Sequence, residues 1–306
     1  MESIFDSSRV REVLSSSAYP PYPMSSVYEH ITEKTGLDFT ATVTFLRQLP
    51  VFIEGNSHAE VRRVMALLLK SRRKDMEIAL DEEIGRLIDS LFKPGRQFDL
   101  VADFSAPLWR TAMSFIVSEN DLPLASEIAT LFDPDASPRR RYAINMQIRA
   151  FLSDPSPERL TGMALAALGV KPFVGSLALS VYETIAHHKS TLLSDMQWLD
   201  HLPVSAIRFI ERIHRPQSSG VNKDDHQLIR CNLHHSSFSG HSNVAATFGH
   251  GPHICLGKGL TELAWKGIVG RLRATRYIAQ ASDLEMAPSE KPFYMPAAAR
   301  VTIREA

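Results

Sequence analysis

The chain has 306 residues, of which 44% are hydrophobic and 22% are charged, proportions typical of a folded globular protein. Thirty-four basic residues balance thirty-four acidic ones, so the overall charge gives no reason to expect nucleic acid or an anionic membrane as a partner. The length suits one large domain or two, and no internal repeat or linker divides the sequence. We therefore expect a single domain over residues 1–306.

The sequence carries no targeting or membrane signal that we recognise. Its start, "MESIFDSSRV", lacks the basic and then apolar order of a secretion signal, and no apolar run approaches the roughly 18 residues of a membrane span. Two cysteines, Cys231 and Cys255, are too few for a disulfide framework. These features predict a cytoplasmic protein, and they leave Cys255 as either a reactive thiolate or an inert buried cysteine.

The first half of the chain predicts several helices. Residues 1–57 combine short helices with a proline-punctuated extended segment. From His58 to about Leu91, apolar residues recur at three- and four-residue spacing, which predicts a helix that "KPG" ends. A short extended lead and another helix are expected in residues 96–117, followed by a charged loop at 133–142.

A long apolar segment follows the helix start at residues 153–160. Residues 161–188 are apolar nearly all round, which predicts a helix through the middle of the protein. Gly169 and Pro172 lie inside this helix. Because proline lacks an amide hydrogen and bends a helix, the interruption indicates either a boundary or a functional kink.

The last hundred residues predict a short helix at 203–216 and a polar, histidine-rich loop at 222–243. An amphipathic helix follows Cys255, and one or two strands are expected in residues 291–306. The expected fold is therefore mainly α-helical with little sheet.

The string "FGHGPHICLG", residues 248–257, places Cys255 in a glycine-rich loop just before this amphipathic helix. The glycines would let the backbone approach something flat and large. The unpaired amides and the positive dipole end at a helix start favour a thiolate. These conditions suit a cysteine that binds haem iron, although a phosphate-binding or purely structural turn uses the same glycines.

The whole string resembles the haem-binding loop of the cytochrome P-450 family, in the form common among soluble bacterial members. That loop runs Phe, two residues, Gly, a spacer with a basic residue, Cys, one residue, Gly. The resemblance implies that Cys255 is the axial ligand of haem b (iron protoporphyrin IX), that Phe248 packs beside it and that His253 reaches a propionate. The implied cofactor-binding loop comprises Phe248, Gly249, Gly251, His253, Cys255 and Gly257.

A second motif lies upstream, where "HAEVRR" is similar to the propionate-binding helix of the same family. His58 and Arg62 are four residues apart, which puts them on one helix face. A solvated helix face explains the pair when it is taken alone. Beside the cysteine loop, the resemblance implies that the two side chains bind the two haem propionates.

The central helix departs from the family. Members carry Ala/Gly-Gly-x-Asp/Glu-Thr above the iron, where the acid and the alcohol help deliver protons to dioxygen. Aligned on Gly169, this chain has Lys171 and Pro172 at those positions. The peroxide-using fatty-acid hydroxylases have Arg-Pro there, with the arginine on the substrate carboxylate. We therefore predict Lys171 as a catalytic residue that binds an anionic substrate, and the alternative is that it pairs with a carboxylate of the protein.

Two further departures concern the Glu-x-x-Arg helix and the length. Aligned on "RIHRP", Arg212 is kept but Phe209 takes the glutamate position. The chain is short before His58, between Arg62 and Gly169, and between Arg212 and Cys255. The resemblance implies a compact cytochrome P-450-like haem domain over 1–306, with trimmed N-terminal and substrate-covering regions and reduced β-sheet content.

The implied function is that of a haem-thiolate oxidoreductase acting on a small organic molecule in specialised metabolism. It would be either a monooxygenase supplied by a ferredoxin-like electron donor, or a variant that bypasses dioxygen by using peroxide or an N–O substrate. An acidic donor would dock on basic residues that a solvated surface explains equally well: Lys70, Arg72, Arg73, Lys266, Arg271 and Arg273. The alternative is an inactive homologue that binds and activates a partner enzyme.

Overall fold

The structure is a computed structural model that describes residues 1–154, 156–214, 227–238, 247–286 and 292–306. Its helices are α1 (Ser7–Ser15), α2 (Met24–Thr35), α3 (Thr40–Leu46), α4 (Gly55–Leu91), α5 (Ala106–Met113), α6 (Leu122–Ile128), α7 (Pro138–Phe151), α8 (Pro157–His187) and α9 (Lys258–Leu272). Its strands are β1 (Glu2–Ile4), β2 (Gln97–Asp99), β3 (Phe209–His214), β4 (Gln227–Asn232), β5 (Ile278–Met286) and β6 (Pro296–Arg304).

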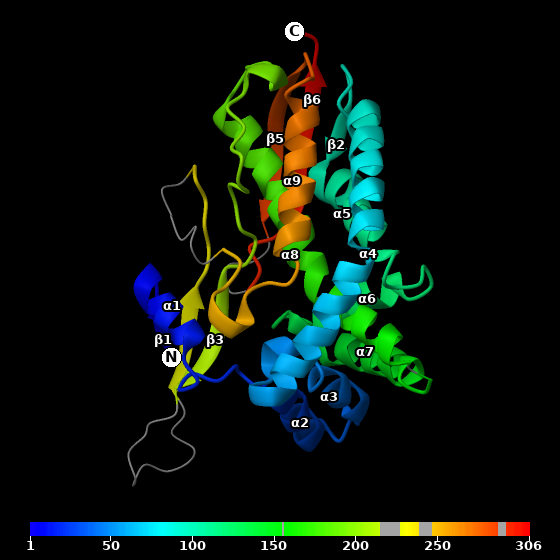
Figure 1. The fold of residues 1–306 in the computed structure, drawn as a ribbon, viewed down its shortest axis with the longest axis vertical. Coiled ribbons are helices and arrows are strands. Elements are labelled where there is room, and N and C mark those ends of the chain that lie inside the picture. Colours follow the sequence, from blue (N-terminus) through cyan, green and yellow to red (C-terminus); the bar gives the residue numbers. More distant parts are fainter. Residues whose placement is uncertain (155, 215–226, 239–246, 287–291) are drawn as a thin grey trace.

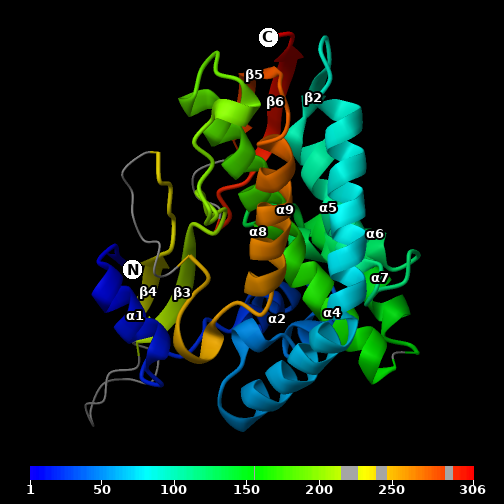
Figure 2. The same ribbon diagram turned by 45° about the horizontal axis from the view of Figure 1, so that its top comes forward.

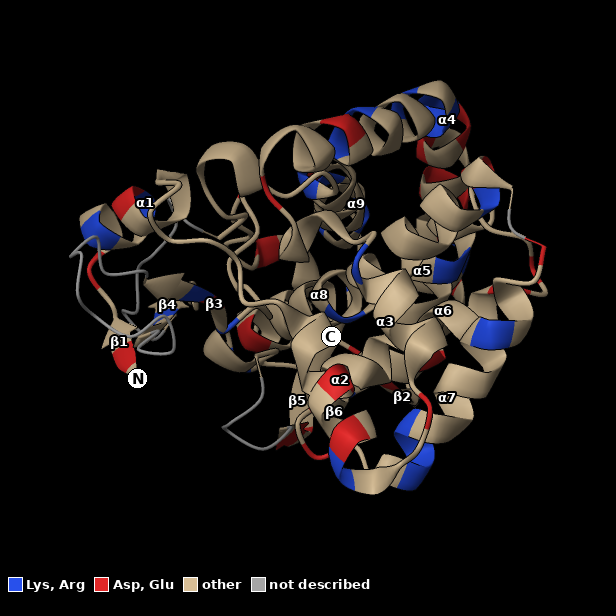
Figure 3. Ribbon diagram, turned by 90° about the horizontal axis from the view of Figure 1, so that it is seen from below, with Lys and Arg blue, Asp and Glu red and all other residues tan. Residues whose placement is uncertain are grey.

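Helix α8 is the central element of the fold. Ser156 caps its first turn by accepting a hydrogen bond from the Arg159 amide, and Pro157 stands at the first helical position, where its missing amide costs nothing. The helix continues through Gly169 and Pro172, so the predicted interruption is not a boundary. Many charges lie on outer helices such as α4 and α7 (Figure 3), whereas the 31 residues of α8 include only Glu158, Arg159, Lys171 and Glu183.

Helix α8 is also the one described helix that is long and apolar enough to cross a membrane. In its most apolar stretch, however, 67% of the residues are buried inside the protein. It packs against α4, α5, α6 and α9 and against strands β5 and β6. Figures 1 and 2 show α9 running beside it, with α4 on the outer side. These contacts explain its all-round apolar sequence as that of a core helix.

Two three-stranded sheets flank the helices. In one, β4 lies between β1, which is parallel to it, and β3, which is antiparallel to it. In the other, β6 lies between β2 and β5, and both pairs are antiparallel. One large hydrophobic cluster joins the helices to the second sheet. A smaller cluster joins α1 to β1 and β4.

The helix expected at residues 203–216 is wrong. Residues 209–214 form strand β3, and residues 215 and 216 lie outside the described part of the chain. The strand pairs with β4, which falls within the segment expected to be a polar loop, 222–243; residues 222–226 and 239–243 of that segment are not described. Six residues are too few for the pattern of apolar residues to distinguish a strand from a helix when the pairing partner is unknown. Strand β5 was also not predicted.

The other expected helices are confirmed. The helix predicted from His58 to Leu91 is α4, the helix after the lead at residue 96 is α5, and the helix after Cys255 is α9. Strand β6 lies in the C-terminal segment where strands were expected. The mainly α-helical fold with little sheet is therefore confirmed.

Candidate functional site

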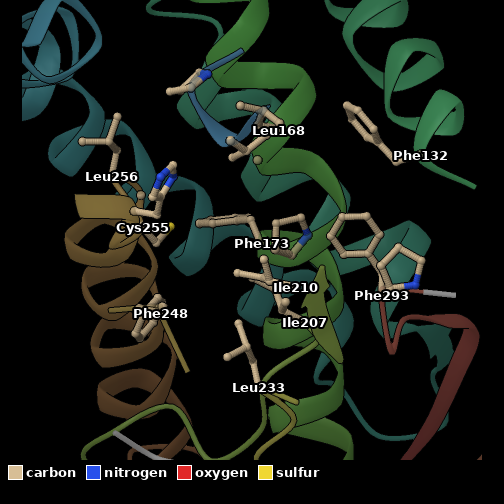
Figure 4. Close-up of a pocket in the computed structure, with 18 of the residues that line it drawn as sticks. Phe132, Leu168, Phe173, Ile207, Ile210, Leu233, Phe248, Cys255, Leu256 and Phe293 are labelled. Atoms are coloured by element: carbon tan, nitrogen blue, oxygen red, sulfur yellow. The ribbon is translucent and has the colours of Figure 1, made fainter. Parts of the chain in front are cut away.

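A cavity of about 680 Å³ lies between α8 and the cysteine loop. Figure 4 shows Cys255 and Phe248 on one side of it, Phe173 of α8 near the middle, and Phe132 and Phe293 on the far side. Most side chains that line it are apolar. The polar ones include Arg62, Arg212, His253 and Trp109.

Tight backbone geometry shapes the cysteine loop. Gly249 and Gly251 have φ angles of +75° and +63°, which residues with side chains rarely adopt. A Cβ on Gly251 would also come within 3.0 Å of the Ser15 backbone in α1. The Cys255 amide closes the loop by donating to the Phe248 carbonyl at 2.7 Å. Gly249 and Gly257 line the cavity, whereas the bare side of Gly251 faces α1.

The Cys255 side chain lines the cavity at the start of α9. Burial raises the pKa of its thiol. The backbone amides of Gly257 and Lys258, which donate toward the sulfur, and the charge of Arg62 act in the opposite direction. No side chain caps this end of α9, so its first amides are available to the sulfur. A bound metal cation would add the charge needed to deprotonate the thiol.

Four nitrogen-bearing side chains gather beside the loop. His58 and Arg62 come from α4, and His253 comes from the loop, as the sequence motifs predicted. The rings of His58 and His253 lie 4.1 Å apart between centroids, and Arg62 Nη2 donates to the Ile254 carbonyl at 2.6 Å. Arg212 of β3 is the fourth member, and its charge lowers the pKa of both histidines.

Arg212 is the residue for which the sequence alignment was wrong. It lies on strand β3 and not on a Glu-x-x-Arg helix, and it faces the cavity. The segment "FIERIH" offered no clear local signal for a strand, because its apolar and polar residues do not alternate. The side chain is 2% exposed, yet its Nε and Nη1 have no hydrogen-bond partner.

The cluster is electrostatically crowded. Burial, Arg212, His58 and Arg62 together lower the pKa of His253 to about 3. Burial lowers the pKa of Arg212 to about 10, with a smaller opposite effect from Cys231 and Glu54. The Nε2 atom of His58 is buried without a partner. Buried donors of this kind are costly unless an anion or another acceptor satisfies them.

Lys171 does not take the position expected above the cavity. On α8, Leu165, Leu168, Gly169, Pro172, Phe173 and Ser176 line the cavity. At about 100° per residue these residues form one face, and Lys171 lies outside it. Its ammonium contacts the Asp133 carboxylate at 2.5 Å, and the two side chains are only 16% and 19% exposed. The geometry therefore favours the alternative, a lysine paired with a carboxylate of the protein.

The depressed pKa of His253 predicts a pH-dependent stability for the haem-free protein. Because the unfolded chain binds this proton near the ordinary histidine pKa of 6.5, stability present at pH 7.5 is lost as the pH falls below that value. We expect a loss of about 1 kcal/mol at pH 5 from this group, after allowing for its partial exposure.

Urea unfolding of the haem-free protein at pH 7.5 and pH 5 measures the effect. His253→Gln should reduce the stability lost between the two pH values, whereas His30→Gln, at an exposed histidine of α2, should leave it unchanged. An equal pH dependence in the wild type and His253→Gln would contradict the assignment.

No protein-family model matches the sequence, and no curated protein matches it. Solved structures do match over almost the whole chain. P450BioI, in complex with an acyl carrier protein ligated to hexadec-9Z-enoic acid, has a TM-score of 0.75 at 15% identity, with 99% of this chain and 92% of that chain covered.

Two further structures give the same result. CYP109B1 from Bacillus subtilis has a TM-score of 0.65 at 15% identity, covering 98% of this chain and 92% of that one. Epothilone B-bound P450epoK has a TM-score of 0.69 at 14% identity, covering 99% and 91%. The expected fold class, mainly α-helical and P450-like, is confirmed, and the chain has the cytochrome P450 fold.

Proposed function

We propose that the protein is a haem-thiolate oxidoreductase that acts on a small organic molecule. Haem b would lie in the cavity with Cys255 as its axial ligand. The observation that carries the proposal is the placement of Arg212, a buried cation with unpartnered nitrogens, beside the same cavity as Cys255. A cofactor with both an iron and carboxylates would bind Cys255 through the iron and Arg212 through a carboxylate.

The residues present fit haem. Carboxylates would receive hydrogen bonds from Arg212, His58 and His253, which now lack acceptors or are crowded by like charge. Arg62 would join them by turning away from the Ile254 carbonyl. Phe248 and Leu256 on the loop side and Leu168 and Phe173 on α8 supply apolar walls for the porphyrin faces. The fold also supports this cofactor, since its solved examples are cytochrome P450 structures.

The bound haem would supply the redox chemistry, and the protein would supply binding, orientation and exclusion of water. Cys255 would give its thiol proton to solvent when it binds the metal. Leu168, Pro172 and Phe173 would give the α8 side of the cavity a mostly apolar lining. Residues 1–306 would act as one trimmed haem domain in the cytoplasm.

The rest of the cavity favours a neutral, apolar substrate. Its far part is lined by Phe132, Ile207, Ile210, Leu233 and Phe293 (Figure 4). The acidic substrate inferred from Lys171 has no support in the geometry, because the Asp133 carboxylate already pairs with that ammonium. Among solved relatives in fold, one is bound to epothilone B and another to a fatty acyl group on a carrier protein. A small, largely apolar organic molecule suits the lining of this cavity.

The residues on the cavity face of α8 bear on which oxidant the protein would use. That face carries no acid: of the two residues at the family's acid and alcohol positions, Lys171 lies outside the face and Pro172, which lines it, has no hydroxyl group. We therefore favour the variant that uses peroxide or an N–O substrate over a monooxygenase. A ferredoxin-like donor gains no support, because four of the six basic residues considered for docking are ion-paired: Arg72, Arg73, Arg271 and Arg273.

The same α8 face also favours a second candidate, a P450 homologue without catalytic activity that binds and activates a partner enzyme. The two candidates differ in turnover. If the protein binds haem through Cys255 but neither peroxide nor dioxygen with reductant gives turnover of any apolar compound that it binds, the second candidate is the better one.

The Cys255 assignment predicts a spectroscopic signature. The purified, reduced protein treated with carbon monoxide should show the red-shifted absorption band of a thiolate-bound haem. In Cys255→Ser this band should be lost, while Cys231→Ser, at the buried cysteine of β4, should keep it. The proposal is wrong if the wild-type protein binds no haem.

The Arg212 assignment predicts a specific loss of haem retention. Arg212→Leu removes a charged donor, so we expect haem binding to weaken about tenfold or more, without loss of the thiolate band in the haem that remains. Arg230→Leu is the matched control: Arg230 lines the same cavity and its Nε also lacks a partner, but its charge is balanced by Glu211 at 2.8 Å. Haem transfer to apomyoglobin measures retention, and equal rates for both variants would contradict the assignment.

The Lys171–Asp133 pair predicts a stability effect without a substrate effect. Lys171→Met leaves the half-buried Asp133 carboxylate without its ion-pair partner, so the free energy of unfolding should fall by about 1–3 kcal/mol. The affinity for neutral apolar ligands should stay unchanged, and acidic analogues should bind no better to the wild type than to the variant. Tighter binding of carboxylic acids by the wild type would restore the catalytic role first predicted for Lys171.

A further inference from the structure

Trp109 differs from the other two tryptophans in the chain. Trp198 and Trp265 donate their indole N–H groups to the carbonyls of Leu193 and Leu199, at 2.8 and 2.9 Å. Trp109 is only 3% exposed, yet its Nε1 has no hydrogen-bond partner. A buried tryptophan N–H ordinarily finds an acceptor, because an unpaired buried donor is unfavourable. Its missing acceptor therefore needs an explanation.

The unpaired donor lies against the cavity face of α8. Trp109 belongs to α5, which packs on both α4 and α8, and it lines the cavity together with Gly169. Its Nε1 is 3.9 Å from the position that a Cβ on Gly169 would occupy. The indole N–H is thus beside the same turn of α8 that, by family alignment, would carry the missing acid and alcohol.

The same turn carries an unusual acceptor. Pro172 has no amide hydrogen, so the Leu168 carbonyl cannot receive the hydrogen bond that an α-helix gives it from four residues ahead. Leu168 and Pro172 both line the cavity, and Leu168 precedes Gly169 directly. A donor without an acceptor and a carbonyl deprived of its helical donor therefore lie within one helical turn of each other.

We propose that Trp109 and the Leu168 carbonyl together bind one hydroxyl-type oxygen at the Pro172 position of α8. The oxygen accepts a hydrogen bond from Nε1 and donates its own hydrogen to the carbonyl. An O–H group of either water or an alcohol-bearing ligand has this chemistry. Trp109 is then a positioning residue, which gives the mostly apolar α8 side of the cavity a polar anchor.

The inference deepens the proposed function, since it concerns the α8 side of the same cavity, but it does not require haem. A failure of the proposed function would appear as a missing carbon-monoxide band. A failure of this inference would appear in ligand binding, which can be measured whether or not the purified protein contains haem.

The experiment compares benzyl alcohol with toluene, which share a ring and differ in the hydroxyl group. Equilibrium dialysis gives the affinity of each compound for four proteins: the wild type, Trp109→Phe, Pro172→Ala and Trp265→Phe. Trp109→Phe removes the donor, and Pro172→Ala restores an amide that occupies the Leu168 carbonyl. Trp265→Phe is the control, because its indole is bonded elsewhere.

If an alcohol is the bound group, the preference for benzyl alcohol over toluene should fall about five- to tenfold in Trp109→Phe and in Pro172→Ala, and stay unchanged in Trp265→Phe. If water is the bound group, the preference is the same in all four proteins. A crystal structure of the ligand-free protein then shows an ordered water within about 3.2 Å of both Nε1 and the Leu168 oxygen. The proposal is overturned if the preference is unchanged and no such water is present.

Discussion

The buried guanidinium of Arg212 is the constraint on which the site depends. A charge held at 2% exposure without a carboxylate at Nε or Nη1 is unfavourable in an isolated protein. Strand β3 holds it there by pairing with β4, and residues of both strands line the cavity. Helix α4 and the cysteine loop place His58 and His253 beside Arg212. Three separate parts of the chain therefore supply nitrogen groups that need a hydrogen-bond acceptor at the same place.

Helix α8 imposes the second constraint, which concerns what the cavity can do. Its cavity face is mostly apolar, and the one lysine of its middle pairs with Asp133. That ion pair also holds the segment after η3 (Ala129–Phe132) against α8, where Phe132 and Pro134 reach the cavity. Arg141 secures the same segment by donating to the carbonyls of Asp133, Pro134 and Ala136. The far wall of the cavity is therefore held in place by the Lys171–Asp133 pair, neither member of which lines the cavity, and by Arg141, which does line it.

Local sequence signals predicted the helices and the position of the cysteine loop, because a period of 3.6 residues and a glycine-rich helix start are properties of short segments. The i, i+4 spacing of His58 and Arg62 likewise fixed a shared helix face. Strand β3 could not be found in this way, since its identity depends on pairing with β4. Lys171 was misplaced for a related reason: its partner lies 38 residues earlier in the chain, and no local pattern reveals that contact. Trp109 carried no sequence signal at all.

The close contact of Gly251 with Ser15 has a practical consequence for handling the protein. Helix α1 presses on the loop that holds Cys255, and it is itself fixed by β1 and β4 through Val10, Val13 and Leu14. The first fifteen residues thus support the conformation of the cysteine loop. Deleting these residues would remove that support, whereas the residues after β6 lie at the opposite end of the molecule, away from the cysteine loop (Figure 1). A shortened version of the protein should therefore keep α1 if it is to keep the shape of the cysteine loop.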